Sequence, residues 1–424
     1  MRLQIEKLVG GGRGLARYNG QVVFVPHVLP GEIVEVDLLP PPHRTQPPDY
    51  LEGTVRQILE PALERRVPPC PLFGICGGCQ LQHLTREAQC RYKREMLMDA
   101  LTRIGKLTGV LVQPTVASPA DFGYRCRVRF AVKHGQMGFY AYHTHRIVPV
   151  SECPILTSAL NTLLKDIQGN LPLYTLSEVE LQAATASGAP HMEEVLVILR
   201  GKQFPAGVAK AFYETRRPLL CGMVIETDRG RQTWGRTTLT YSGMPRPLRV
   251  RHNAFVQINL EVNRLIIACL MSQICKEDRV LELYSGSGNI TLPLSQHADS
   301  VTAIERCRHA VADARANLKG VTNVILRCAP VEQAIPTLKG PYTVAVLDPP
   351  REGVPSNVLT ALARLRPQRI FYLSCDPATL ARDLARLCKD GYTCTSVWPF
   401  DMFPQTAHVE ALATLEAYPR GSHA

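Results

Sequence analysis

A cysteine lies between a predicted strand and a predicted helix near the end of the chain. The apolar run 369–373 favours a strand, and leucines recur at helical spacing after Pro377. Proline is common at the first position of a helix. Cys375 would then lie where unpaired N–H groups and the helix dipole favour an anion. We expect this position to lower the pKa of the thiol and make Cys375 a nucleophile. The alternative is a buried, inert cysteine.

A glycine-rich loop follows an apolar strand further upstream, in segment 281–289. Its small residues let the backbone approach a ligand at the carboxyl edge of a sheet. Glu305 ends the next predicted strand, where a carboxylate can accept hydrogen bonds from both ribose hydroxyls of a nucleoside. The order Gly-Ser-Gly-Asn departs from a full dinucleotide fingerprint, so it favours S-adenosylmethionine over NAD or FAD.

The fourth predicted strand of this region ends in Asp348-Pro349-Pro350-Arg351. Many nucleic-acid methyltransferases carry an acidic or amide residue before two prolines at this place. In enzymes that methylate amino groups an aromatic residue usually follows and stacks on the base. Arg351 replaces that aromatic residue here, which disfavours amino-group chemistry.

Three closely spaced cysteines lie in a loop rich in proline and glycine, with the pattern Cys70-x5-Cys76-x2-Cys79. Cys153, which precedes a proline, is the best candidate for a fourth ligand. Four thiolates can bind an iron–sulfur cluster or zinc. Radical S-adenosylmethionine enzymes usually space their cysteines by three and then two residues, so this pattern disfavours that chemistry.

The pattern of elements predicts three domains, at residues 1–58, 59–245 and 246–424. The first has short strands separated by turns, which is typical of a small β-barrel. The second holds the cysteine loop, a predicted helix at about 86–104 that could pack on the third domain, and mixed strands. The third alternates strands with helices and ends in two strands, which predicts a doubly wound α/β sheet with a late hairpin. Its predicted strands are 280–284, 301–305, 324–327, 344–348, 370–374, 393–399 and 409–415.

Composition indicates a globular protein with a polyanionic partner. The 424 residues carry a formal net charge of +11, which favours nucleic acid. Segment 1–7 already alternates as a strand does, and no apolar run reaches about 18 residues, so we expect no signal peptide and no membrane span. Fourteen cysteines without a secretory signal indicate reduced thiols. We therefore expect a cytoplasmic, monomeric protein.

Three arginines alternate along a predicted strand at 124–130. Arg125, Arg127 and Arg129 would share one face of that strand. This face could grip phosphates, or it could be an ordinary solvated polar face.

Five blocks of the C-terminal half together resemble the RNA uracil-C5 methyltransferase family. The N-terminal segment 5–17 looks like a TRAM domain, an OB-type barrel found on RNA-modifying enzymes, and the cysteine pattern extends the resemblance to most of the chain. The five blocks are residues 255–259, 283–293, 348–351, 374–383 and 402–410.

The resemblance implies a Rossmann-like methyltransferase domain, an N-terminal TRAM barrel and a central α+β iron–sulfur domain. It makes Cys375 the nucleophile that adds to C6 of uracil, and Glu410 the base that removes the proton from C5. It also implies a four-iron cluster on the four cysteines named above, with zinc as the alternative. The residues expected to bind S-adenosylmethionine are Gln257, Tyr284, Gly286, Asn289, Glu305 and Asp348.

This assignment agrees with the chemistry of the base. C5 of uracil is a poor nucleophile until a thiolate adds at C6 and turns the ring into an enolate, and a base must then remove the C5 proton. The target base must also leave its stack. Two residues depart from the family pattern: Asp376 stands where Asn is usual, and Ser285 where Cys is usual. The carboxylate of Asp376 would oppose thiolate formation if it lay close to the sulfur.

The barrel and the cysteine loop resemble most the family members that act on 23S ribosomal RNA, and transfer RNA is the alternative substrate. An RNA-binding iron–sulfur protein without catalysis is the competing hypothesis. The presence of Cys375 and Glu410 argues against it.

Overall fold

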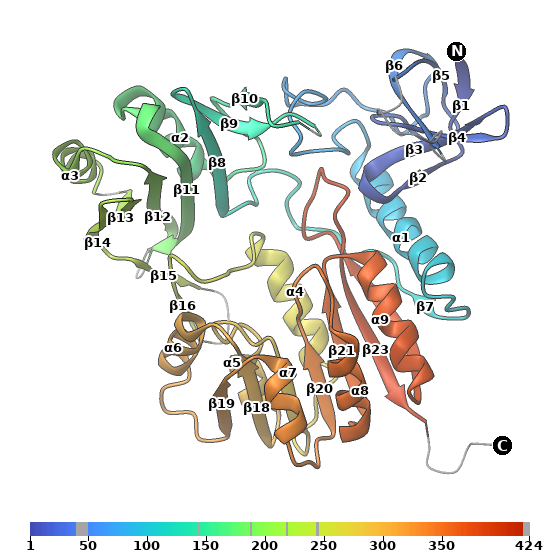
Figure 1. The fold of residues 1–424 in the computed structure, drawn as a ribbon, viewed down its shortest axis with the longest axis vertical. Coiled ribbons are helices and arrows are strands. Elements are labelled where there is room, and N and C mark those ends of the chain that lie inside the picture. The colour runs from blue at the N-terminus through green and yellow to red at the C-terminus, as the bar shows by residue number, and fades with distance from the viewer. Residues whose placement is uncertain (40–49, 143, 187–188, 218, 243–245, 419–424) are drawn as a thin grey trace.

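The computed structural model describes residues 1–39, 50–142, 144–186, 189–217, 219–242 and 246–418 (Figure 1). Three sheets organise the chain. A small blue sheet lies at the N-terminus, a green mixed sheet follows, and a yellow-to-red sheet forms the C-terminal part. Among the described residues no helix is long and apolar enough to cross a membrane.

The N-terminal unit is a six-stranded sheet in the order β1-β5-β6-β4-β3-β2. Segment 1–7, which alternates in sequence as one strand does, in fact belongs to two strands, because the N–H of Ile5 donates to the carbonyl of Glu32 while the N–H of Glu6 donates to the carbonyl of Leu15. A core of buried aliphatic residues fills the unit. Its strands are β1 (Arg2–Gln4), β2 (Lys7–Val9), β3 (Arg13–Tyr18), β4 (Gln21–Val25), β5 (Ile33–Leu38) and β6 (Tyr50–Glu60), with η1 (Gly10–Gly12) between β2 and β3.

The central unit is a seven-stranded mixed sheet in the order β10-β9-β8-β11-β12-β13-β14. Helices α2 (Ser158–Asn170) and α3 (Ala206–Thr215) pack on it, as Figure 1 shows, and a separate pair β15-β16 follows. Its strands are β8 (Arg127–Lys133), β9 (Gln136–Tyr140), β10 (Ile147–Pro149), β11 (Leu176–Ala186), β12 (Ala189–Gly201), β13 (Leu220–Thr227) and β14 (Gly230–Gly235), with η2 (Leu173–Thr175), β15 (Thr238–Tyr241) and β16 (Leu248–Arg251).

The arginines of β8 form ion pairs within the sheet. Arg127 and Arg129 both contact Glu180, at 2.6 Å and 3.2 Å, and the side chain of Glu180 is fully buried. Burial acts to raise the pKa of Glu180, but the charge of Arg127 and a hydrogen bond from Arg200 lower it to about 2. These two guanidiniums therefore neutralise a buried carboxylate, which makes a phosphate-binding role unfavourable for them.

The C-terminal unit is an eight-stranded sheet in the order β19-β18-β17-β20-β21-β23-β22-β7. Strands β17 to β21 run parallel, and β23 is antiparallel to both of its neighbours, so the predicted doubly wound sheet with a late hairpin is confirmed. Its late strands are β17 (Arg279–Leu283), β18 (Ser300–Glu305), β19 (Val324–Cys328), β20 (Val344–Leu347), β21 (Arg369–Ser374), β22 (Tyr392–Phe400) and β23 (Glu410–Ala417).

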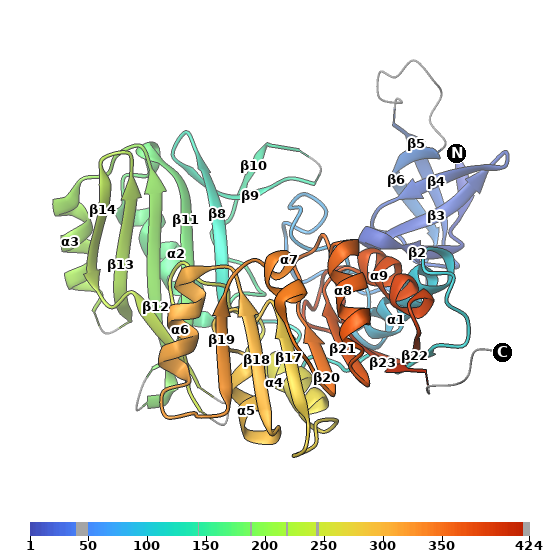
Figure 2. The same cartoon turned by 60° about the horizontal axis from the view of Figure 1, so that its bottom comes forward.

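Helices cover both faces of this sheet (Figure 2). They bury apolar residues at helical spacing, as Leu380, Leu384 and Leu387 do in α9. These helices are α4 (Leu260–Met271), α5 (Thr291–His297), α6 (Arg308–Asn317), α7 (Val331–Ala334), η3 (Ile335–Thr337), α8 (Ser356–Leu365) and α9 (Pro377–Lys389).

Two elements from before residue 246 pack with this sheet. Helix α1 (Arg86–Arg103) runs beside α9 in both views, and its Leu97 and Leu101 share a core with Leu384 (Figures 1 and 2). Strand β7 (Leu111–Val112) extends the sheet by pairing with β22. Segment 86–112 thus packs as part of the C-terminal unit. The sequence assigned it to the central domain but already allowed the helix at about 86–104 to pack on the C-terminal domain.

Candidate active site

Cys375 lies between the end of β21 and the start of α9, as the sequence predicted. Asp376 caps α9: its Oδ1 accepts a hydrogen bond from the backbone N–H of Thr379 at 2.8 Å. Pro377 takes the first helical position. The carboxylate of Asp376 is therefore engaged by the helix, and it is not among the groups that shift the pKa of Cys375.

The surroundings of Cys375 raise the pKa of its thiol to about 11. Burial is the largest cause, followed by the carboxylate of Glu410, and Asp348 adds to the rise; only Arg351 opposes it, by charge and by a hydrogen bond. The expectation of a lowered pKa is therefore wrong for the protein without ligands. A helix N-terminus contributes up to about 2 kcal/mol, whereas burial can shift a pKa by several units.

Glu410 begins β23 and is 3% exposed. Strands β21 and β23 are antiparallel with Ser374 opposite Ala411, so the next pair in the same register is Cys375 opposite Glu410. Burial and the nearby Asp348 raise the pKa of Glu410 well above its usual value, and Arg351 opposes that rise. The register thus brings together two residues that the sequence separates, and burial favours the neutral form of the Glu410 carboxyl.

Asp348 follows β20, the parallel neighbour of β21, so it reaches the same edge of the sheet. Burial raises its pKa to about 7. Arg351, three residues later, is the cation that acts on both Cys375 and Glu410. The sequence identified Arg351 only as the replacement of an aromatic residue and missed this role; the available signal was a lone cation directly after two prolines.

A hollow of about 810 Å³ gives access to Cys375. Its walls come from the N-terminal sheet, α1, the cysteine loop, the start of α9 and the segment before β23. Arg13, Arg103 and Lys106 line it together with the acidic Asp99 and Asp376. A hollow of this size suits a nucleotide, and its cations can contact the phosphate.

A buried ion pair holds the segment that leads to Glu410. Lys93 of α1 contacts Asp401 at 2.5 Å, both side chains are at most 1% exposed, and the ammonium also donates to the carbonyl of Phe403 at 2.9 Å. The buried charge of each residue is compensated by the other, and the pair connects α1 to segment 401–409.

Gln405 fixes the same segment to the cysteine loop. Its backbone carbonyl accepts hydrogen bonds from Gln80 and Leu81, while its side-chain oxygen accepts from Gln89 at 3.0 Å and from Arg66 at 2.8 Å. The residue is 1% exposed and has a φ of 70°, an uncommon backbone conformation outside glycine. The cysteine loop, α1 and the segment before Glu410 therefore form one hydrogen-bonded assembly.

The glycine loop after β17 has unpaired polar atoms suited to a ligand. Tyr284 takes a left-handed φ of 65°, and the N–H of Gly286 donates to Glu305 at 3.0 Å. Glu305 also accepts from the N–H of Cys307 at 2.7 Å. Within the part of the chain that the structure describes, the buried hydroxyls of Tyr284, Ser285 and Ser287 have no hydrogen-bond partner. Buried polar atoms without partners fit a site that a polar cofactor completes.

The other predicted cofactor residues differ in their placement. Asn289 exchanges two hydrogen bonds with Asn263 of α4, at 2.9 Å and 3.0 Å, so its amide braces the loop. Gln257 lies buried just before α4. The sequence missed Glu282, a fully buried carboxyl under the loop whose pKa burial raises to about 8. An acidic residue inside an otherwise apolar strand was the signal.

The four predicted ligand cysteines gather from two segments of the chain. Burial is the main reason that the pKa of Cys79 rises to about 12, and the charges of Cys153, Cys76 and Cys70 each add to the rise. The pKa of Cys153 rises to about 11 for the same reasons. Over the described residues, however, no three Cys, His, Asp or Glu side chains stand in metal-binding geometry. The thiols are thus close enough to interact without forming a closed ligand set.

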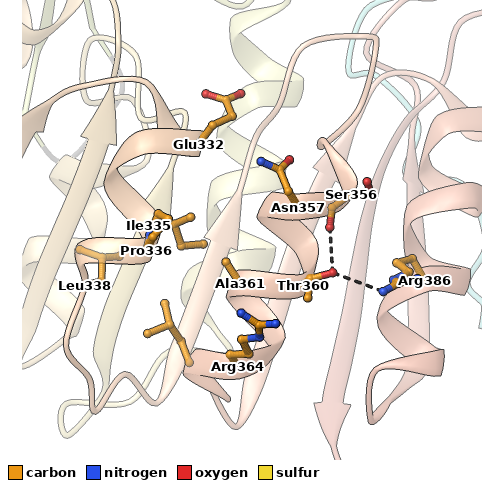
Figure 3. A pocket seen from close by; sticks show the side chains of 11 residues that line it. Glu332, Ile335, Pro336, Leu338, Ser356, Asn357, Thr360, Ala361, Arg364 and Arg386 are labelled. Carbon is orange, nitrogen blue, oxygen red and sulfur yellow. Dashed lines mark hydrogen bonds between the residues drawn. The ribbon is translucent and has the colours of Figure 1, made fainter.

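A second hollow, of about 620 Å³, lies between η3 and α8 (Figure 3). Thr360, Arg364 and Arg386 line it, and none of the predicted site residues does. Cys375, the candidate nucleophile, lines the hollow of about 810 Å³ instead.

The strand order and the glycine loop define the fold of an S-adenosylmethionine-dependent methyltransferase, and comparison with known proteins agrees. A family model described as tRNA (Uracil-5-)-methyltransferase matches residues 236–334 and 341–418, and a TRAM domain model matches residues 1–39. A solved structure described as Pyrococcus abyssi tRNA (uracil-54, C5)-methyltransferase in complex with S-adenosyl-L-homocysteine is 23% identical with a TM-score of 0.76, and the match covers 98% of this chain and 100% of that one.

Relatives match along nearly the whole chain. An uncharacterized RNA methyltransferase of Halalkalibacterium halodurans is 31% identical over 98% of this chain and 96% of its own length. A Pseudomonas putida protein named 23S rRNA (uracil(1939)-C(5))-methyltransferase RlmD is 33% identical over 98% of this chain and 93% of its own. The chain belongs to the RNA uracil-C5 methyltransferase family.

Proposed function

We propose that this RNA uracil-C5 methyltransferase acts on a uridine of 23S ribosomal RNA, through a transient bond between Cys375 and C6 of the base. The observation that carries the proposal is the β21–β23 register, which sets Cys375 opposite Glu410 beside Asp348 and Arg351. The hollow around Cys375 supplies the access that a base flipped out of its stack needs.

The residues divide the chemistry as follows. Arg351 stabilises the thiolate of Cys375, which adds to C6 and moves negative charge onto the uracil ring. The enolate formed in this way makes C5 nucleophilic. After C5 has gained a methyl group, Glu410 removes the C5 proton, and the electron pair left on C5 expels the sulfur from C6.

S-adenosylmethionine, which we place at Gln257, Tyr284, Gly286, Glu305 and Asp348, supplies the methyl group and a positive charge that lowers the pKa of neighbouring acids. This electrostatic effect is needed because the thiol and Glu410 both have raised pKa values in the protein without ligands. The unpaired hydroxyls of the glycine loop support this location.

Two variants test the covalent mechanism. We expect Cys375→Ala to bind the cofactor and transfer no methyl group, and turnover by this variant would refute the role of the thiol. We expect Glu410→Gln to accumulate a covalent RNA adduct, because the amide cannot take up the C5 proton. Rapid and complete product release by Glu410→Gln would remove Glu410 from the role of base.

The substrate is tested by methylation with a labelled methyl donor. Ribosomal RNA is favoured because a relative 33% identical over nearly the full chain is named for 23S RNA, whereas the transfer-RNA neighbour is 23% identical. We expect incorporation into unmodified 23S transcripts and not into transfer RNA. Preferential labelling of transfer RNA would establish the alternative, and labelling of neither RNA would favour a non-catalytic RNA-binding protein.

We propose that Cys70, Cys76, Cys79 and Cys153 hold a four-iron cluster with a structural role. The four thiols are partly buried, and the pKa values of Cys79 and Cys153 are raised by burial and by the neighbouring cysteines, so the group fits a cationic centre. Iron and acid-labile sulfide analysis of anaerobically purified protein tests this. About four of each per chain supports the cluster, and one zinc without sulfide would identify the zinc site instead.

A further inference from the structure

A separate hollow of about 600 Å³ lies on the hairpin formed by β9 and β10, next to the cysteine loop. Its volume falls within the roughly 300–1,000 Å³ typical of small-ligand sites. The mechanism described above uses none of its side chains. It is lined by Gly77, Gly78, Phe139, Tyr140, Ala141, Tyr142, Thr144 and His145.

The wall of this hairpin hollow is aromatic. Tyr140 is 49% exposed, and its ring meets that of His145 edge-on, with centroids 5.8 Å apart and an interplanar angle of 84°. An edge-on contact leaves a face of the tyrosine ring available for stacking. Nucleobases stack on such rings in proteins that bind single-stranded RNA.

Glycines form the opposite side. The N–H of Gly77 donates to the carbonyl of Tyr140 at 3.0 Å, and a Cβ on Gly77 would lie only 3.0 Å from that same oxygen. The cysteine loop is therefore held against the hairpin, and no side chain projects from Gly77 or Gly78 to fill the space. The backbone contact fixes the position of Tyr140 and gives a flat ligand room beside the ring.

The hairpin hollow and the catalytic hollow are neighbours, because Tyr142 lines both. Arg146 directly follows His145 in the chain and is exposed, and its guanidinium pairs with no acidic side chain in the ranges that the structure describes. An unpaired cation beside an aromatic wall is the combination that phosphate and base recognition require. A strand that places one base at Cys375 can thus continue past Tyr142.

We propose that the hairpin hollow binds the base of a nucleotide that neighbours the target uridine, unstacked from the RNA and held against Tyr140. This inference rests on the proposed RNA substrate. The bound base fixes the position of the strand, so that the adjacent uridine enters the catalytic hollow. Tyr140 therefore contributes to RNA affinity and leaves the chemical step to Cys375 and Glu410.

The test compares Tyr140→Ala with Tyr140→Phe in the full-length protein, on an RNA stem-loop that contains the target uridine. Tyr174→Ala is the matched control, because Tyr174 is 82% exposed and lies outside both hollows. We expect Tyr140→Ala to raise the RNA Kd and KM by about tenfold, in the range measured for loss of one stacked base, while kcat at saturating RNA stays within about twofold. Tyr140→Phe keeps the ring and should behave as the wild type.

A fluorescent base identifies the occupant. With 2-aminopurine on each side of the uridine in turn, one position should change its fluorescence on binding the wild type and lose that change with Tyr140→Ala. Wild-type RNA affinity for Tyr140→Ala, or an equal loss for Tyr174→Ala, would overturn the inference and leave the proposed function intact. A wild-type protein that neither binds nor methylates RNA would overturn both. A thermal melt of each variant shows whether it is still folded. The variant His145→Ala removes the other ring of the aromatic wall and leaves Tyr140 in place.

Discussion

Removal of the buried cation Lys93 tests how the segment before Glu410 is held in place. The variant Lys93→Met keeps the length and helix propensity of the side chain but leaves Asp401 buried without its partner 2.5 Å away. Breaking such a pair costs about 3–5 kcal/mol, a large part of the total stability of about 5–15 kcal/mol expected for a domain. The carbonyl of Phe403 also loses its donor.

The chain offers a matched control on the same helix. Lys7 contacts Asp99 at 2.6 Å, nearly the same distance, but the two side chains are 40% and 36% exposed. An exposed pair of this kind contributes about 0–1 kcal/mol. Lys7→Met should therefore change the stability of segment 401–417 little, although it removes the same type of ion pair.

Hydrogen exchange of peptides from 401–417 measures the local stability of this segment without assuming that the whole chain unfolds in one step. Lys93→Met should speed exchange there by roughly 10²- to 10⁴-fold, and Lys7→Met by less than about fivefold. The double variant Lys93→Met/Asp401→Leu should regain most of the protection, since it removes the unpaired charge. Equal exchange in the two single variants would refute the reasoning from burial.

Three further predictions concern individual site residues. Asp376→Asn should keep the helix cap and the activity, whereas Asp376→Ala should lose about 1 kcal/mol in urea unfolding; a large loss of activity in the Asn variant would contradict the capping role. Arg351→Met should raise the pKa of Cys375 further above 11, so the rate of iodoacetamide labelling of the Cys375 peptide at pH 9 should fall; unchanged labelling would show that Arg351 does not act on the thiol. Glu282 has a folded-state pKa of about 8, above its unfolded value, so its contribution to stability is lost as pH rises from about 4.5 to 8. The variant Glu282→Gln should therefore show a smaller fall of Tm between these pH values. An unchanged slope of Tm against pH would contradict the raised pKa of Glu282.

Much of the fold could be predicted because local patterns and tertiary structure agree. The strands predicted at 280–284 and 370–374 correspond to β17 and β21 within one residue, and the helix predicted at about 86–104 is α1. Their apolar runs are long and bounded by clear turn or cap residues. Strand β7 could not be predicted, because two residues carry no periodicity and pair only when β22 is already in place.

The sequence predicted that Cys375 and Glu410 would meet, but it did not predict their electrostatic environment. The motif order identified Cys375 and Glu410, and the antiparallel register of two neighbouring strands then brought them together. The direction of the thiol pKa shift was predicted wrongly, because burial depends on packing from α1, the barrel and segment 407–409, which no local pattern encodes. The domain limits at residues 58 and 245 stay predictions. Helix α1 lies in the central part of the sequence but packs on α9 of the C-terminal unit, so domain limits drawn along the sequence differ from the packing units of the structure.

The central claim is that the sulfur of Cys375 bonds to C6 of the target uracil. The most direct test incubates the wild-type protein with S-adenosylmethionine and a 23S stem-loop that carries 5-fluorouridine at the target position, since a base cannot remove fluorine from C5 as it removes a proton. Peptide mass spectrometry should then find a methylated RNA adduct on Cys375. A stable adduct on another residue, or complete methylation of ordinary RNA by Cys375→Ala, would contradict the account.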